Sequence, residues 1–144
     1  MPPDLSAYLG ISTMTLATVG ADGYPHAAPV YFVADGDLQL YFFSTEGSQH
    51  ARDTAASPEA AVALYPDCFG WQEIRGLQMH GRVRKVEPGP AWQRAWELYR
   101  VKFPFVAGME AEVKRNTLYV FIPRWVRLVD NRQGFGFKQE WTLP

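Results

Sequence analysis

Two Asp-Gly turns between apolar runs constrain the first third of this chain more than any other feature. The turn segments read GADG at 20–23 and ADGD at 34–37. Asp-Gly supplies the positive φ angles that a tight hairpin turn needs. The flanking runs are rich in β-branched, aromatic and alanine residues and cover Thr13–Val19, Tyr24–Val33 and Leu38–Phe43. The pattern predicts a three-stranded antiparallel meander.

The rest of the chain continues mainly as β structure. Further strands are expected at Ala60–Tyr65, Glu73–Glu87, Thr117–Ile122 and Trp125–Val129. Gly81 would mark a bulge or bend within the long second run. The glycine-containing segment NRQGFGFKQEW follows at 131–141, with no element assigned to it. Many short antiparallel strands of this kind indicate a single domain over residues 1–144, built as a small β-barrel.

Three helices are expected to interrupt the strands. Asp4 is placed to cap a short helix that Gly10 ends, and Ser48–Ala56 forms a second helix that Ser57-Pro58 stops. The third lies within PGPAWQRAWELYRVKFP at 88–104 and carries an aromatic stripe at helical spacing. The stripe consists of Trp92, Ala95, Trp96 and Tyr99. It predicts packing against the barrel or a partner, and together with the strand edges it suggests a homodimer.

Composition excludes several classes of protein. A net charge of −1 and a pI of about 6.3 give no nucleic-acid signature. A hydrophobic fraction of 47% with 15% aromatic residues is typical of a globular chain. The single cysteine, Cys68, excludes an internal disulfide and a cysteine-pair zinc site. We find no charged leader with an apolar core and no apolar run of membrane-spanning length. We therefore expect a soluble, cytoplasmic protein that does not bind a membrane.

The stretch YFFSTEGSQHARD, Tyr41 to Asp53, holds the most chemical information. It passes from an apolar strand to hydroxyls and then to basic side chains at a helix start. Ser48 could simply cap the helix. The same place could also bind an anion, since a helix N-terminus offers free N–H groups and a positive dipole end. The stretch alone leaves both interpretations open.

Motifs of other chemistries are missing. The sequence holds no G-x-G-x-x-G after a strand, no Walker loop, no H-E-x-x-H and no G-x-S-x-G. His26, His50 and His80 lie on separate predicted elements without an acidic cluster, so no metal site is assigned. No residue stands out as a catalytic acid, base or nucleophile.

The order of these segments resembles the FMN-binding split barrel of the pyridoxamine 5′-phosphate oxidase superfamily. In that family a strand end with a hydroxyl residue, followed by a serine and a basic residue on a short helix, holds the FMN phosphate. Phe43, Ser44 and Thr45 match the strand end, and Ser48-Gln49-His50 stands where the serine and basic residue would be. The segments EIRGLQMHGRV and LVDNRQGFGFKQEW look closest to a small, poorly characterised branch. The resemblance implies an antiparallel, Greek-key-like split barrel that dimerises with its cofactor at the subunit interface.

Two departures from the family pattern affect the phosphate site. His50 stands in place of the usual lysine, so its contribution would depend on protonation. The strand Tyr24–Val33 lacks the arginine that the oxidase uses for the phosphate, and Arg52 and Arg75 are the candidates to supply that charge. Vitamin B6 oxidation is therefore not expected.

The flavin ring needs a flat, largely apolar surface. The small side chains of Ala27, Ala28 and Pro29 would let a ring approach the strand backbone. Trp71 and Trp141 are candidate aromatic walls, although each could be ordinary core or interface.

Three functions remain open from the sequence. The first is an FMN-dependent oxidoreductase acting on an unknown small molecule. The second is a flavin- or haem-binding carrier or sensor without turnover, and the third is a cofactor-free dimeric scaffold. A deazaflavin in place of FMN also stays open, and the sequence names neither the substrate nor the electron donor.

Overall fold

The hairpin predicted around the first Asp-Gly turn is present in the computed structural model, which describes residues 4–144. Strands β1 (Thr13–Val19) and β2 (Pro25–Tyr31) pair antiparallel along their whole length. The N–H of Gly20 donates to the carbonyl of Tyr24 at 2.9 Å, and Gly23 adopts a φ of 86°. This part of the prediction is confirmed.

The predicted three-stranded meander is wrong. The run expected as one strand breaks at Phe32 into β2 and the short β3 (Val33–Ala34). Phe32 is buried in the barrel interior, whereas the next residue, Val33, is buried under a helix on the other face. Strand β4 (Leu40–Ser44) then pairs with β3 and β7, so β2 and β3 lie at opposite ends of the sheet order.

The second turn also differs from the expectation. Leu38, with a φ of 62°, takes the positive-φ position that Gly36 was expected to take. The Asp35 carboxylate accepts hydrogen bonds from the backbone N–H groups of Asp37 and Gln39, at 2.9 and 3.0 Å. These bonds hold a longer turn than a two-residue hairpin.

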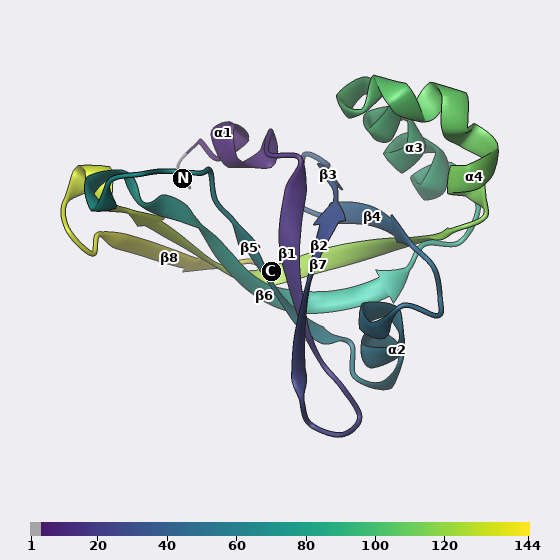
Figure 1. Cartoon of the computed structure of the whole chain (residues 1–144), viewed down its shortest axis with the longest axis horizontal. Coiled ribbons are helices and arrows are strands. Elements are labelled where there is room, and N and C mark those ends of the chain that lie inside the picture. The colour runs from purple at the N-terminus through teal and green to yellow at the C-terminus, as the bar shows by residue number, and fades with distance from the viewer. Residues whose placement is uncertain (1–3) are drawn as a thin grey trace.

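The remaining strands complete one antiparallel sheet that curls into an open half-barrel (Figure 1). They are β5 (Glu59–Leu64), β6 (Arg75–Lys85), β7 (Thr117–Asp130) and β8 (Lys138–Thr142). The order along the sheet is β2-β1-β5-β6-β7-β4-β3, with β8 paired to β7. The mainly antiparallel β fold expected from the sequence is confirmed.

Strand β7 corrects the prediction of two separate strands, at 117–122 and 125–129, because it runs continuously through Pro123. The register of β6 against β7 shifts between His80, which pairs with Trp125, and Gly81, which pairs with Pro123. Arg124 is therefore the extra residue of a bulge on β7, next to the proline. A Cβ atom on Gly81 would lie 2.0 Å from the Ile122 carbonyl oxygen. The bulge predicted at this glycine is confirmed, and it lets two long strands bend together.

Helices α1 (Ser6–Leu9), α2 (Gln49–Ala56) and α3 (Pro90–Lys102) lie where they were expected. The sequence prediction missed the 3₁₀ turn η2 (Pro104–Met109) and the short helix α4 (Glu110–Lys114) that follow α3. It also missed β8 and the 3₁₀ turns η1 (Trp71–Glu73) and η3 (Asn131–Gln133). Within residues 4–144, no helix is both long and apolar enough to cross a membrane.

Helix α3 covers the outside of the sheet with its aromatic stripe. Trp96 and Tyr99 are each only 4% exposed and pack with Val33, Phe103 and Val106. The stripe is therefore largely covered by its own chain rather than left for a partner.

Lys102, in the last turn of α3, ties this helix to the barrel. Its Nζ donates to the carbonyls of Leu9, Ile11 and Phe32 at 3.0, 2.7 and 2.8 Å. The same atom lies 3.7 Å from the centroid of the Phe32 ring, and burial lowers the pKa of the amine to about 8. These contacts fix α3, and with it η2 and α4, over the edge of the half-barrel.

Candidate functional site

Ser48 caps α2, as the simpler interpretation of the sequence predicted. Its backbone is extended, with φ −67° and ψ 155°, and its Oγ accepts the Ala51 N–H at 3.3 Å. The hydroxyl also donates to the Thr45 carbonyl at 2.9 Å. The N–H groups of Gln49 and His50 stand in the first turn, where a helix offers no intrahelical acceptor. Capping therefore leaves donors at this helix start for a ligand.

Two further side chains meet Ser48 at the start of α2. Ser44, the last residue of β4, places its Oγ 3.1 Å from Ser48 Oγ and 2.6 Å from His50 Nε2. Because the Ser48 hydroxyl donates its proton to the Thr45 carbonyl, we assign a series of hydrogen bonds in which His50 Nε2–H donates to Ser44 Oγ and the Ser44 hydroxyl donates to Ser48 Oγ. We call Ser44, Ser48 and His50 the hydroxyl–imidazole cluster.

The imidazole of His50 is half-buried, which decides its charge. Burial lowers the pKa of His50, and the nearby charge of Asp53 only partly opposes that effect. The ring is therefore neutral at pH 7 when no anion lies beside it.

The cluster opens into a cavity of about 420 Å³ between β2, β4 and the segment that runs from α3 to α4. Aromatic and aliphatic side chains dominate its lining, and no acid, lysine or arginine belongs to the lining within residues 4–144. Ser44 pairs with Thr117 in the sheet, which brings the polar lining residue Asn116 to the same end as the cluster. The full lining is Pro29, Val30, Tyr31, Phe43, Ser44, His50, Tyr99, Phe103, Phe105, Val106, Met109, Val113 and Asn116.

Arg52 does not join the cluster in this structure. Its guanidinium donates to the Gly47 carbonyl and to Gln49 Oε1, the latter at 3.0 Å. Gln49 is exposed and donates in turn to Asp53 Oδ1 at 2.7 Å. Both side chains are thus engaged within α2 and its preceding loop.

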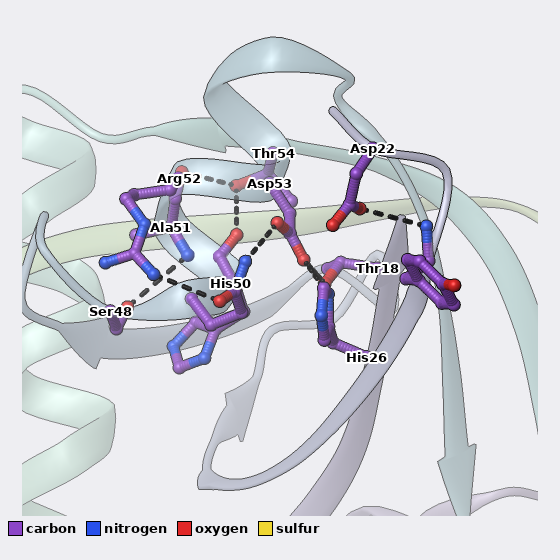
Figure 2. Close-up of polar contacts among 11 residues, drawn as sticks. Thr18, Asp22, His26, Ser48, His50, Ala51, Arg52, Asp53 and Thr54 are labelled. Atoms are coloured by element: carbon purple, nitrogen blue, oxygen red, sulfur yellow. Dashed lines mark hydrogen bonds and ion pairs between the residues drawn. The ribbon is translucent and has the colours of Figure 1, made fainter. Parts of the chain in front are cut away.

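A buried carboxylate that the sequence interpretation missed holds α2 in place. Asp53 is 3% exposed and accepts hydrogen bonds from Thr18 Oγ1 at 2.7 Å, His26 Nδ1 at 2.8 Å and Gln49 Nε2 (Figure 2). Burial raises the pKa of Asp53, but these hydrogen bonds together lower it by a larger amount. The pKa of Asp53 is therefore below its usual value. The sequence did indicate that Thr18 points inward, because it follows Met14 and Leu16 at every second position of the strand.

The predicted ring-approach residues lie on the edge strand β2. Ala27 and Pro29 are exposed and Ala28 is half-buried, and only Pro29 of the three lines the cavity. Phe43 lines it as well, whereas Thr45 is exposed and contributes its carbonyl to Ser48.

Three other predicted residues lie away from the cavity in the single chain. Trp71 is in η1, 55% exposed, with its ring centroid 5.6 Å from that of Phe135. Arg75 begins β6 and donates to the Glu73 carbonyl at 3.0 Å. Trp141 lies on β8 and packs against the barrel core, and β8 is at the opposite end of the sheet from α2 (Figure 1). One subunit alone does not bring these residues to the cluster.

The fold is shared with several solved structures. A conserved hypothetical protein from Mycobacterium tuberculosis superposes with a TM-score of 0.77 at 21% identity, covering 90% of this chain and 84% of that one. HutZ, described as the haem storage protein of Vibrio cholerae, gives a TM-score of 0.68 at 19% identity, covering 78% and 81%.

Sequence comparison agrees with the fold. A pyridoxine/pyridoxamine 5′-phosphate oxidase from Burkholderia multivorans is 43% identical over 76 residues, which are 52% of this chain and 33% of that protein. The match thus spans about a third of the length of that curated relative. The family model described as pyridoxamine 5′-phosphate oxidase matches residues 4–130. With most of its length in this match, the chain belongs to the pyridoxamine 5′-phosphate oxidase family.

Proposed function

We propose that the protein binds FMN and uses it to oxidise or reduce a small molecule. The observation that carries this proposal is the hydroxyl–imidazole cluster at the start of α2, because it opens directly into an aromatic cavity. A flavin nucleotide has two matching parts. Its phosphate suits the polar cluster, and its flat ring suits the aromatic cavity. Membership of the oxidase family supports the assignment.

The polar end of the cavity fits the phosphate. Ser44 lines this end and would turn its hydroxyl from Ser48 to the phosphate, and the first turn of α2 supplies backbone N–H groups with the positive end of the helix dipole. His50 would add a charge when protonated.

The apolar end fits the ring. A volume of about 420 Å³ falls within the usual range of small-molecule sites, roughly 300 to 1,000 Å³. Phe43, Tyr99 and Phe103 give the aromatic surface, and Pro29 with Val30 gives the backbone of an edge strand. Bound flavin supplies hydride or electron transfer. The chain itself would orient the ring and exclude water from one of its faces.

We further propose that a homodimer completes the site. The stripe on α3 no longer supports this idea, but other large side chains remain uncovered, with Phe69 102%, Phe135 84% and Tyr24 69% exposed. In a dimer the partner could bring Trp71, Arg75 and Trp141 to the cavity. Light scattering should give twice the chain mass of 16.3 kDa at micromolar protein, and a monomer mass would contradict the dimer.

A haem-binding carrier is the second candidate. The neutral imidazole of His50 lines an apolar cavity, and neutral imidazole is a common ligand for haem iron. The structural likeness to a haem storage protein adds an analogy at the level of the fold.

An absorption spectrum of the purified protein tests these functions. A shift in the absorption bands of FMN when it is mixed with the protein would support the proposal. A Soret band would favour haem. Anaerobic bleaching of bound flavin by a nicotinamide cofactor would support turnover over a carrier role. If FMN, a deazaflavin and haem all fail to bind, only the cofactor-free scaffold remains.

A matched pair of variants tests the phosphate contact. Ser44→Ala should weaken FMN binding and leave riboflavin binding unchanged, because riboflavin has no phosphate. Thr45→Ala, a neighbouring exposed hydroxyl, is the control and should affect neither ligand. Equal weakening of both ligands by Ser44→Ala would place the ring, rather than the phosphate, at the cluster.

A further inference from the structure

The polar end of the cavity, where we propose that the phosphate binds, has no fixed positive charge in its lining within residues 4–144. Its lining within residues 4–144 includes no lysine or arginine, and His50 is the one lining group that can become a cation near neutral pH. A dianionic phosphate bound in a partly apolar cavity needs at least one positive partner. Within one subunit the required charge must therefore come from His50, whereas the proposed dimer would add Arg75 of the partner subunit.

Hydrogen-bond accounting gives the same result. A neutral imidazole has a single N–H. In the series of hydrogen bonds that we assign, this N–H donates to Ser44 Oγ, 2.6 Å away. The other ring nitrogen, Nδ1, is then an acceptor and cannot donate to a phosphate oxygen. Protonation at Nδ1 creates both a donor and a charge without breaking the bond to Ser44.

Three basic side chains outside the lining already have partners. Arg52 donates to Gly47 and Gln49, and Lys85 pairs with Glu46 at 2.6 Å. On α4, Lys114 pairs with Glu110 at 2.7 Å. These contacts hold the side chains of Arg52, Lys85 and Lys114 on partners other than a phosphate in the cavity.

The other titratable groups around His50 do not replace it. Asp53 lies on the same helix and raises the pKa of His50, but burial has the larger effect. Figure 2 shows the imidazole and the Asp53 carboxylate pointing in different directions from α2. Tyr31 and Tyr99 line the cavity, and Tyr119 stacks on Phe42 with a centroid distance of 5.4 Å. Burial raises the pKa of Tyr99 and of Tyr119, so these two phenols are uncharged near neutral pH.

We infer that the site binds FMN together with one proton, which His50 takes up at Nδ1, so that it discriminates a phosphorylated flavin from riboflavin in a pH-dependent way. This inference rests on the proposed FMN function. It makes His50 a residue that sets both the specificity for the phosphate and its pH range. By linkage, a proton taken up on binding makes the ligand bind more weakly as the pH rises.

The experiment measures the Kd of FMN and of riboflavin between pH 7 and pH 8.5, by quenching of flavin fluorescence. In this range the FMN phosphate is already largely dianionic, since such groups have a second pKa near about 6. The Kd of FMN should rise by up to about tenfold per pH unit, and that of riboflavin should stay constant. Calorimetry in two buffers of different ionisation enthalpy should show about one proton taken up per FMN.

Two variants identify the group. His50→Lys carries a fixed charge and should bind FMN with a flat pH profile. His50→Gln keeps an N–H donor without a titratable group, so it should bind FMN weakly, with a flat profile and no proton uptake. Thermal unfolding of both apoproteins shows whether the replacements disturb the fold.

The outcomes separate this inference from the proposed function. FMN binding to the wild-type protein with a flat profile and no proton uptake would refute the inference but leave the proposed function standing. A slope that persists in His50→Gln would assign the proton to another group and would also refute it. If neither FMN nor riboflavin binds at any pH, the proposed function fails, and the inference fails with it.

Discussion

Asp130 offers a direct test of how the loop beside Trp71 and Arg75 is held. It ends β7 and pairs with Arg75 in the sheet register. Its side chain is 6% exposed and accepts hydrogen bonds from the Nε and Nη2 of Arg132 at 2.9 and 3.0 Å, from the Arg132 N–H, and from Gln133. The Arg132 side chain, more than the other contacts, lowers the pKa of Asp130 from 3.8 to about 2.

The size of the effect follows from linkage. The pKa difference, 3.8 minus 2, is about 1.8, and at about 1.4 kcal/mol per pKa unit it corresponds to about 2.5 kcal/mol of stability. Between pH 2 and 3.8 the unfolded chain binds more protons than the folded chain. This contribution is therefore fully present above pH 3.8 and is lost as the pH falls through 2. Because Arg132 is half exposed, 2.5 kcal/mol is an upper figure.

The variant Asp130→Asn keeps the shape and removes the charge. Urea unfolding followed by circular dichroism should show a loss of about 2 kcal/mol at pH 7, which shrinks below pH 3.8 and nearly disappears at pH 2. Asp67→Asn, at an exposed site, is the control and should change stability little at any pH. A loss that is the same at pH 7 and pH 2.5 would refute the argument that the Asp130 charge is the source of the stability.

Three further variants test the site. Ser48→Ala should lower the free energy of unfolding of the apoprotein by about 1 kcal/mol in urea, because it removes the cap of α2; an unchanged midpoint would mean that water replaces the cap. Arg52→Ala should change the Kd of FMN by less than about fivefold, or about 1 kcal/mol, since Gly47 and Gln49 hold its guanidinium away from the cluster; a loss beyond tenfold would show that the guanidinium swings to the phosphate. Arg75→Ala should release flavin from the dimer and leave thermal unfolding of the apoprotein nearly unchanged, whereas retained flavin would assign Arg75 to solvent.

Local chemistry determined much of the architecture in advance. The Asp-Gly turn at Gly23, the alternation in Thr13–Val19 and the cap at Ser48 each depend on residues within a few positions of one another, and the structure confirms all three. Gly81 was identified because a glycine inside a strand indicates a close backbone approach. The oxidase family was recognisable from the order of elements, and the family match confirms it.

The tertiary structure alone decided how these elements meet. Whether β4 pairs with β2 or β7 depends on Phe32 and Val33 entering different cores, which no local pattern encodes. Two of the three partners of Asp53, Thr18 and His26, lie 35 and 27 residues away, on strands that only the folded sheet brings to α2. Likewise, Ser44 and His50 were predicted together, but the orientation of Arg52 away from them depends on the carbonyl of Gly47 and the side chain of Gln49. Short-range propensity specifies strands and turns, whereas pairing, burial and side-chain direction depend on contacts between segments far apart in the chain.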